Sequence, residues 1–230
     1  MYDNKPQLYG RRKGQKLGKQ QNHLLESFLP ELHIDIDLQA PEKTLELESM
    51  FSNEISEYWL EIGFGDGEHF IWQANANPDV GFIGCEPFLN GMGKCLVSVH
   101  ENAIKNIRLY DNDARFLLDR LPECSLNRVF ILFPDPWPKR RHHKRRFITK
   151  DNLDRLARVM KSGAQLRIAS DIDSYITSIL LALQHHKDFT WRDETAEDWR
   201  IRKKDWPETR YERKALREGR KPAYLTFMRT

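Results

Sequence analysis

A glycine-rich segment is the first part of the sequence whose residues could bind a small molecule. It reads LEIGFGDGEHF, with Glu61 two residues ahead of Gly63, and with Gly65 and Gly67 after it. Glycines in such a turn bring the backbone against a ligand, because N–H groups point outward at the start of the following helix. The spacing G-x-G-x-G differs from the G-x-G-x-x-G fingerprint of dinucleotide-binding proteins. The acid favours a cationic ligand over a phosphate, and the alternative is a turn of purely structural use.

Acidic and amide side chains also end the next two apolar stretches. Glu86 closes VGFIGCE, where a doubly wound sheet places an acid that accepts hydrogen bonds from ribose hydroxyls. Asn112, Asp113 and Ala114 end IRLYDNDA, where an aspartate can accept from an exocyclic amine. Each could be an ordinary surface residue, but the carboxyl ends of successive parallel strands converge on one crevice. A ligand with adenosine, a ribose and a positive charge but no phosphate is S-adenosylmethionine.

The most specific motif is LFPDPWPKRRHHKRR, residues 132–146. Two prolines keep the chain extended and hold Asp135 at the mouth of the expected sheet. Trp137 could stack on a base or pack as a buried aromatic under a loop. The six Lys and Arg side chains of residues 137–146 have no acid among them. This run favours contacts to nucleic-acid phosphates over a merely solvated loop.

Two later segments could complete the same site. Asp171 follows the fifth expected strand, either beside the crevice or as the N-cap of the next helix. Thr209, Arg210, Tyr211 and Glu212 have the pattern of a helix start, with a threonine cap and a glutamate three residues on. From the residues alone, this second segment predicts only a helix terminus.

Metal and disulfide chemistry are not predicted. His142 and His143 lie among cations with no acid or thiol nearby, which does not suggest a metal site. Cys85, Cys95 and Cys124 are odd in number and form no C-x-x-C pair, as expected for a protein of the reducing cytoplasm. The N-terminus is basic with no apolar stretch after it, unlike a secretory signal.

A largely parallel sheet is the element that must position these motifs. Apolar stretches rich in β-branched and aromatic residues predict strands at 58–63, 80–86, 107–113, 127–133 and 164–170. Helical patterns predict helices near 68–76, 89–101, 114–121, 151–161 and 173–186. A closing antiparallel pair is expected at 188–194 and 223–229, and His185 and His186 should contact the last carbonyls of the helix before it. Alternation of this kind predicts an α/β fold with a doubly wound sheet.

Composition and charge limit the classes of protein to which the chain can belong. The chain has 230 residues, 40% hydrophobic and 31% charged, which predicts a folded, soluble protein. The longest apolar runs, such as 129–133, fall far short of the roughly 18 residues of a membrane span. The formal net charge is +3, but cations gather at 1–20, 137–146 and 200–221. Residues 1–56 are expected to be a basic and acidic extension, loosely structured over residues 1 to about 50. Residues 57–230 are expected to form the domain that binds S-adenosylmethionine.

These motifs together resemble those of bacterial tRNA (guanine-N7-)-methyltransferases, members of the Rossmann-like class I S-adenosylmethionine-dependent methyltransferases. The segments LEIGFGDGE, NDA, FPDPWPKRRHHKRR, ASD and TRYE agree with that family in order and spacing, over residues 58–229. YGRRKG near the N-terminus is similar to the family's basic arm, whereas residues 23–57 match no motif of the family. The resemblance implies a seven-stranded sheet with an antiparallel C-terminal strand.

The resemblance also implies roles for single residues. The expected contacts to S-adenosylmethionine are Glu61, Glu86, Asp113 and Asp135, with the three glycines, Asn112 and Ala114 beside them, and Asp135 is also the catalytic position. The expected substrate contacts are Lys139, Asp171, Thr209, Arg210, Tyr211 and Glu212. The expected RNA contacts are Arg141, Lys144, Arg145 and Arg146. The implied target is guanosine 46 in the variable loop of tRNA, and either a monomer or a homodimer is compatible with the sequence.

Three other functions compete with this one. Asp-Pro-Trp is distantly similar to the D/N-P-P-aromatic box of amino-group methyltransferases, but the second proline is missing because Trp137 follows Pro136. A catalytically silent RNA-binding module on the same fold is a different class of function, against which the retained acids beside the glycines argue. A nicotinamide-dependent dehydrogenase is disfavoured by the glycine spacing.

Overall fold

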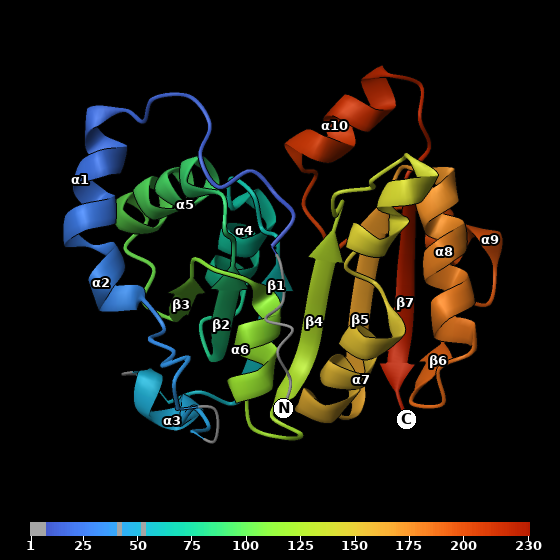
Figure 1. Ribbon diagram of the computed structural model, residues 1–230, viewed down its shortest axis with the longest axis horizontal. Coiled ribbons are helices and arrows are strands. Elements are labelled where there is room, and N and C mark those ends of the chain that lie inside the picture. Colours follow the sequence, from blue (N-terminus) through green and yellow to red (C-terminus); the bar gives the residue numbers. More distant parts are fainter. Residues whose placement is uncertain (1–7, 41–42, 52–53) are drawn as a thin grey trace.

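A mostly parallel sheet forms the centre of the molecule in the computed structural model, which describes residues 8–40, 43–51 and 54–230 (Figure 1). Within these residues the strand order is β3-β2-β1-β4-β5-β7-β6. The strands are β1 (Glu57–Ile62), β2 (Val80–Cys85), β3 (Ile107–Tyr110), β4 (Leu126–Leu132), β5 (Met160–Ser170), β6 (Phe189–Trp191) and β7 (Ala223–Arg229). Pairs from β3 to β5 are parallel, and β7 is antiparallel to both β5 and β6. The predicted fold class is confirmed.

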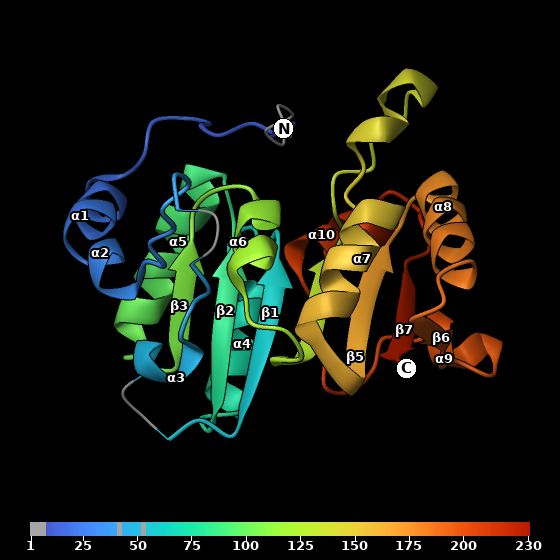
Figure 2. The ribbon, with the colours of Figure 1, turned by 60° about the horizontal axis from the view of Figure 1, so that its bottom comes forward.

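Helices cover both faces of the sheet, as the alternating pattern predicts. One face carries α4 (Glu68–Ala76) and α5 (Leu89–Glu101). The other carries α6 (Ala114–Arg120), α7 (Lys150–Val159) and α8 (Asp173–Gln184), seen in front of the sheet in Figure 2. The strands between these layers are buried on both sides and form two apolar clusters. Strand order reverses between β1 and β4, and such a reversal opens a crevice at the carboxyl ends of the strands.

The described part of the N-terminal extension is folded onto this core, and the expectation of a loose segment is wrong there. It contains α1 (Lys19–Ser27), α2 (Leu29–Leu32) and α3 (Leu47–Met50). Leu24, Leu29 and Leu32 are buried in the same apolar cluster as α5. Helices of four and nine residues show too little periodicity to be found in a sequence, and they gain stability from tertiary packing. Residues 1–7 of the predicted basic arm lie outside the described residues.

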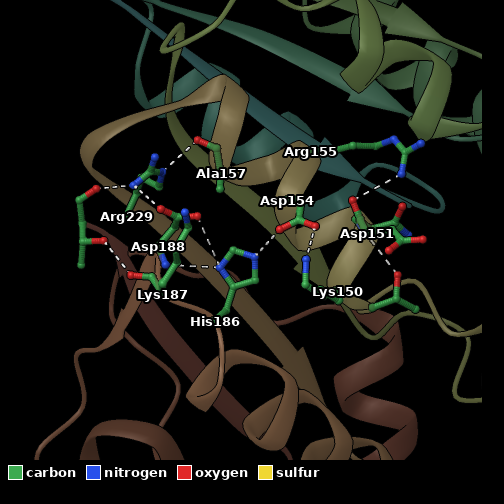
Figure 3. A network of polar contacts seen from close by, with 12 residues as sticks. Lys150, Asp151, Asp154, Arg155, Ala157, His186, Lys187, Asp188 and Arg229 are labelled. Carbon is green, nitrogen blue, oxygen red and sulfur yellow. Dashed lines mark hydrogen bonds and ion pairs between the residues drawn. The ribbon is translucent and has the colours of Figure 1, made fainter.

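The C-terminal strand is tied to the neighbouring helices by a polar network (Figure 3). The His185 ring contacts the Leu181 carbonyl, as expected for a helix end. The same expectation for His186 is wrong, because its Nε2 lies 3.0 Å from a carboxylate oxygen of Asp154 on α7. Arg229 on β7 donates to the Ala157 carbonyl. No helix among the described residues is long and apolar enough to cross a membrane.

Candidate active site

A cavity of about 900 Å³ opens at the carboxyl ends of the central strands. Its volume lies within the range of small-molecule sites, toward the upper end. The cavity brings together predicted residues from four strand ends and their loops: Gly63, Gly65, Glu86, Asn112, Asp113, Ala114 and Asp135. The predicted segments therefore meet at one cavity in the structure.

The glycine loop after β1 needs its glycines for two reasons. Gly63, Gly65 and Gly67 all have positive φ, at 76°, 58° and 85°, a region that L side chains rarely adopt. A Cβ on Gly67 would also lie 2.9 Å from the Cys95 sulfur on α5. Gly63 and Gly65 line the cavity, whereas Gly67 packs away from it and begins α4. The third glycine therefore serves packing, and the first two give a ligand access to the backbone.

Glu86 stands directly after β2 and is held by the glycine loop. Its carboxylate accepts hydrogen bonds from the N–H groups of Gly65, at 2.7 Å, and Phe88, at 2.9 Å. Burial raises the pKa of Glu86 to about 7, although these two donors oppose the shift. Its side chain is thus fixed on the cavity wall, where a sugar hydroxyl could donate to it.

Asp113 follows β3 and caps α6, which makes the predicted strand end also a helix start. Its carboxylate accepts from the Arg115 backbone N–H at 3.0 Å and forms a two-point pair with the Arg115 guanidinium. Asn112 accepts from the Asp113 N–H at 2.9 Å. Arg115, which lines the cavity, was missed in the sequence because nothing in its spacing marks it. It orients the carboxylate expected to bind an exocyclic amine.

The loop of residues 134–137 leaves β4 through two strained positions. Phe133 and Trp137 have φ of 49° and 43°, and such non-glycine conformations cost about 1–3 kcal/mol each. Asp135 and Trp137 both line the large cavity. Loss of surrounding water raises the pKa of Asp135 above its ordinary value. The strained loop therefore presents a carboxylate and an indole to the same space.

Arg146 holds this loop against α8. Its guanidinium donates to the Pro136 carbonyl at 2.9 Å and to Ser174 and Ser178 on the first turns of the helix. It also lies 4.7 Å above the Tyr175 ring, and only 4% of the residue is exposed. Arg146 thus differs from the other cations predicted to contact RNA, since its donors are directed to the protein.

The other predicted RNA contacts gather on one projecting segment. The short helix η1 (Arg140–Arg145) stands beyond the carboxyl edge of the sheet, as the olive-yellow coil at the top of Figure 2. Arg141 and Lys144 on it are exposed, as is Lys139 just before it. The Arg145 guanidinium lies 4.9 Å from the Trp137 ring and 5.0 Å from the Tyr9 ring.

Part of the N-terminal arm reaches the site. Leu8, Tyr9, Gly10 and Arg11 line the cavity. The arm is fixed where it meets α5, because the Leu89 N–H donates to the Arg12 carbonyl at 2.9 Å. The YGRRKG segment is the signal that could have placed these residues at the site.

Glu61 lies in a second, smaller cavity that adjoins the first. The small cavity has a volume of about 20 Å³ and shares Gly63, Phe133 and Tyr211 with the large one. Glu61 lines only the small cavity, and one of its carboxylate oxygens lies 2.6 Å from Nδ1 of His69. A volume of this size holds about one water-sized group, such as an ammonium.

Helix α10 (Arg210–Arg217) closes one side of both cavities. Thr209 caps it as predicted, accepting from the Glu212 N–H at 3.3 Å. The Glu212 side chain turns inward and accepts from the Tyr224 hydroxyl at 2.6 Å. Tyr211 packs against Gly65, where an added Cβ would lie 3.1 Å from its ring.

One ion pair fastens α10 to the glycine loop and a second fastens it to the start of α4, while a further pair holds Asp171. Arg210 pairs with Asp66, and Arg213 pairs with Glu68 at 2.8 Å. Asp171 accepts from the Arg220 guanidinium at 2.5 Å and lines neither cavity. Thr209, Arg210 and Tyr211 are thus brought to the site. Glu212, like Asp171, lines neither cavity, because its buried carboxylate accepts from Tyr224 and Arg202.

The chain is similar over most of its length to known methyltransferases. A family model described as "Putative methyltransferase" matches residues 56–225. The tRNA (guanine-N(7)-)-methyltransferase of Chelativorans sp. (strain BNC1) is 51% identical over 222 residues, 96% of this chain and 94% of that one. The protein of the same name from Bartonella quintana (strain Toulouse) is 48% identical over 235 residues, covering 100% of both.

A solved structure shares the fold at low identity. It is a 16S rRNA (adenine(1408)-N(1))-methyltransferase variant from Catenulisporales acidiphilia, determined with the cosubstrate SAM. The TM-score is 0.52 at 15% identity, over 86% of this chain and 93% of that one. The sequence relationship to the first two proteins spans nearly the whole chain, and on it the protein described here belongs to the tRNA (guanine-N7-)-methyltransferase family.

Proposed function

We propose that this enzyme transfers a methyl group from S-adenosylmethionine to N7 of guanosine 46 in the variable loop of tRNA. The observation that carries the proposal is the convergence of Glu86, Asp113 and Asp135 on one cavity, with Glu61 in the small cavity beside it. Hydroxyl, amine and cation partners for these acids all occur in S-adenosylmethionine. Family membership supports the same reaction.

Each end of the cofactor has a suitable group on the protein. Glu86 would accept from the ribose hydroxyls and Asp113 from the adenine amine, at the strand ends where doubly wound sheets bind nucleosides. Glu61 would face the methionyl ammonium in the small cavity. When bound, S-adenosylmethionine supplies an electrophilic methyl group on a positively charged sulfur. The structural neighbour with the same fold was determined with this cosubstrate.

The reaction needs no general base. Guanine N7 carries an in-plane lone pair and no proton, so no residue has to remove one. As the N7–C bond forms and the S–C bond breaks, the positive charge moves to the base and a neutral thioether is left. Positioning therefore dominates the rate. Asp135 stabilises the cation that develops on the ring.

The cationic segment would hold the RNA. Lys139, Arg141 and Lys144 are exposed beside the cavity mouth and can contact phosphates. The target base must leave its stack to reach the cavity, as for other enzymes that act on bases. Trp137 lines the cavity and offers an aromatic face to such a base. Affinity for tRNA should consequently fall with added salt.

The test is transfer of labelled methyl groups from S-adenosylmethionine to tRNA transcripts, followed by reduction and aniline cleavage at N7-methylguanosine. We expect one cut, in the variable loop, and none in a matched transcript whose position 46 is adenosine. Label without a cut would indicate an amino-group methyltransferase. Binding of tRNA without label would indicate a silent RNA-binding module, and a cut elsewhere would overturn position 46 alone.

Cofactor affinity should depend on pH through Glu86. An ionised carboxylate is needed to accept from two ribose hydroxyls, and burial raises the pKa of Glu86 to about 7. The dissociation constant for S-adenosylmethionine should therefore be about tenfold higher at pH 6 than at pH 8. The stability of the free protein should depend on pH in the opposite direction. Because the pKa of Glu86 is raised in the folded state, its contribution to the free energy of unfolding is lost as pH rises through about 7.

Isothermal titration calorimetry at both pH values would measure this dependence. The matched control is Glu86→Gln, which cannot ionise and should bind weakly with little change between the two pH values. An equal pH dependence in the variant would assign the titration to another group, such as Asp135, whose pKa is also raised.

A further inference from the structure

A buried histidine, His69, lies beside Glu61 and lines the small cavity with it. The side chains of His69 and Glu61 are 2% and 4% exposed, and Nδ1 of the ring is 2.6 Å from the carboxylate. Phe130 and Trp206 contact the ring edge-on, with centroids 4.6 and 6.2 Å away. The ring is thus fixed in its plane, and none of the chemistry described above uses it.

The neighbours of Gln73 determine where the proton on His69 lies. The Gln73 amide nitrogen donates to the Asp205 carbonyl at 2.7 Å, and its oxygen accepts from the Asn77 amide at 3.4 Å. This orientation leaves the second N–H of the Gln73 amide to face Nε2 of His69, at 3.2 Å. Nε2 must then accept, so the proton is on Nδ1 and the imidazole is neutral.

A neutral His69 leaves Glu61 without a cationic partner among the described residues. The other two acids of the small cavity are neutralised: Asp66 pairs with Lys94 and Arg210, and Glu68 pairs with Arg213. A buried carboxylate without a counter-charge is costly. It becomes favourable when a ligand brings the missing positive charge into the cavity beside it.

We propose that His69 is a positioning residue for the methyl donor, which orients the Glu61 carboxylate through one hydrogen bond while adding no charge. A cationic residue in its place would neutralise Glu61 and compete with the ligand's ammonium. Gln73 and the Asp205 carbonyl enforce the required tautomer. This inference rests on the proposed function, because it takes Glu61 as the group that faces the cofactor's positive end.

Two substitutions separate this role from simple packing. The side-chain amide of His69→Asn places a donor near the position of Nδ1, whereas that of His69→Gln places it near Nε2. By calorimetry, His69→Gln should weaken S-adenosylmethionine binding about tenfold or more, the range for a lost hydrogen bond to a charged group. His69→Asn should remain within about threefold of the original protein. Equal losses in both variants would overturn the inference.

A control and a double-mutant cycle complete the test. His186 is also a buried histidine beside an acid, but it lies outside the cavities, so His186→Gln should leave cofactor affinity unchanged. With Glu61→Gln already present, His69→Gln should add little further loss, because His69 acts through Glu61. Additive losses would contradict the inference.

The same measurements distinguish the inference from the proposed function. If Glu61→Gln binds S-adenosylmethionine normally, the assignment of Glu61 to the cofactor fails. If Glu61→Gln weakens binding and His69→Gln does not, the role of His69 alone fails. Should His69→Gln not fold, as judged by thermal melting, Gln73→Met removes the group that enforces the tautomer. A loss of about threefold is then expected, and unchanged affinity would overturn the inference.

Discussion

Arg146→Ala should lower the free energy of unfolding by about 3 kcal/mol, whereas Arg145→Ala should lower it by about 1 kcal/mol. Arg146 is buried, and its removal takes the charged donor away from the Pro136 carbonyl and the Ser178 hydroxyl, whereas the Ser174 carbonyl keeps the Ser178 hydroxyl as a donor. Losing a partner in a buried, charged hydrogen-bond network is among the costliest single changes. Arg145 lies on the projecting segment, where among the described residues its guanidinium contacts two aromatic rings and its buried Nε has no hydrogen-bond partner.

Urea denaturation with thermal melting would measure both variants. A loss of about 3 kcal/mol corresponds to a melting temperature lower by roughly 10 °C in a chain of this size. Filter binding at several salt concentrations should show weaker tRNA binding for Arg145→Ala than for Arg146→Ala. For Arg145→Ala, the slope of log affinity against log salt concentration should be smaller by about one. Two variants equally stable and equally weak in tRNA binding would support the RNA role that the sequence predicts for both residues.

Asp135→Asn should slow methyl transfer by about 100- to 1000-fold at saturating tRNA and cofactor, the usual effect of removing one electrostatic group from a site. Asparagine keeps the size of the side chain and removes the negative charge that, in the proposed mechanism, faces the developing cation. We expect the dissociation constant for S-adenosylmethionine to change by less than about threefold, because the proposed function assigns the ammonium end to Glu61, which lines the small cavity.

Single-turnover rates and calorimetry on the same preparation separate these two effects. A rate restored by excess S-adenosylmethionine would mean that Asp135 binds the cofactor and does not act on the base. The matched control is Asp171→Asn, which removes a carboxylate that lines neither cavity and is paired with Arg220. Its chemical step should keep its rate, although tRNA affinity falls if Asp171 contacts the substrate.

Much of the architecture could be read from local patterns. The five parallel strands and the five helices that follow them lie within a few residues of their predicted positions, because buried strands and amphipathic helices carry strong periodicity. Helices α1 and α2 were not predicted, since a few buried leucines in short segments carry no such pattern. The family, too, follows from the motifs, and the relatives confirm it.

Several residues of the site could be predicted from the sequence, because the carboxyl ends of the strands in a doubly wound sheet meet at one edge. Glu86, Asp113 and Asp135 could be placed at one crevice for this reason. Partners such as Arg115 and His69 could not be predicted, because their contacts cross between segments or depend on a side-chain orientation.

Arg145 and Arg146 show where sequence patterns stop being informative. They are adjacent and identical in type, yet one joins the aromatic rings at the cavity mouth and the other is buried under it. The reason is backbone geometry: η1 ends at Arg145, and Arg146 is extended, with φ of −61° and ψ of 141°. Its side chain therefore points to α8. Motifs name the residues of a site, but burial and pairing follow from the direction in which the folded backbone points each side chain.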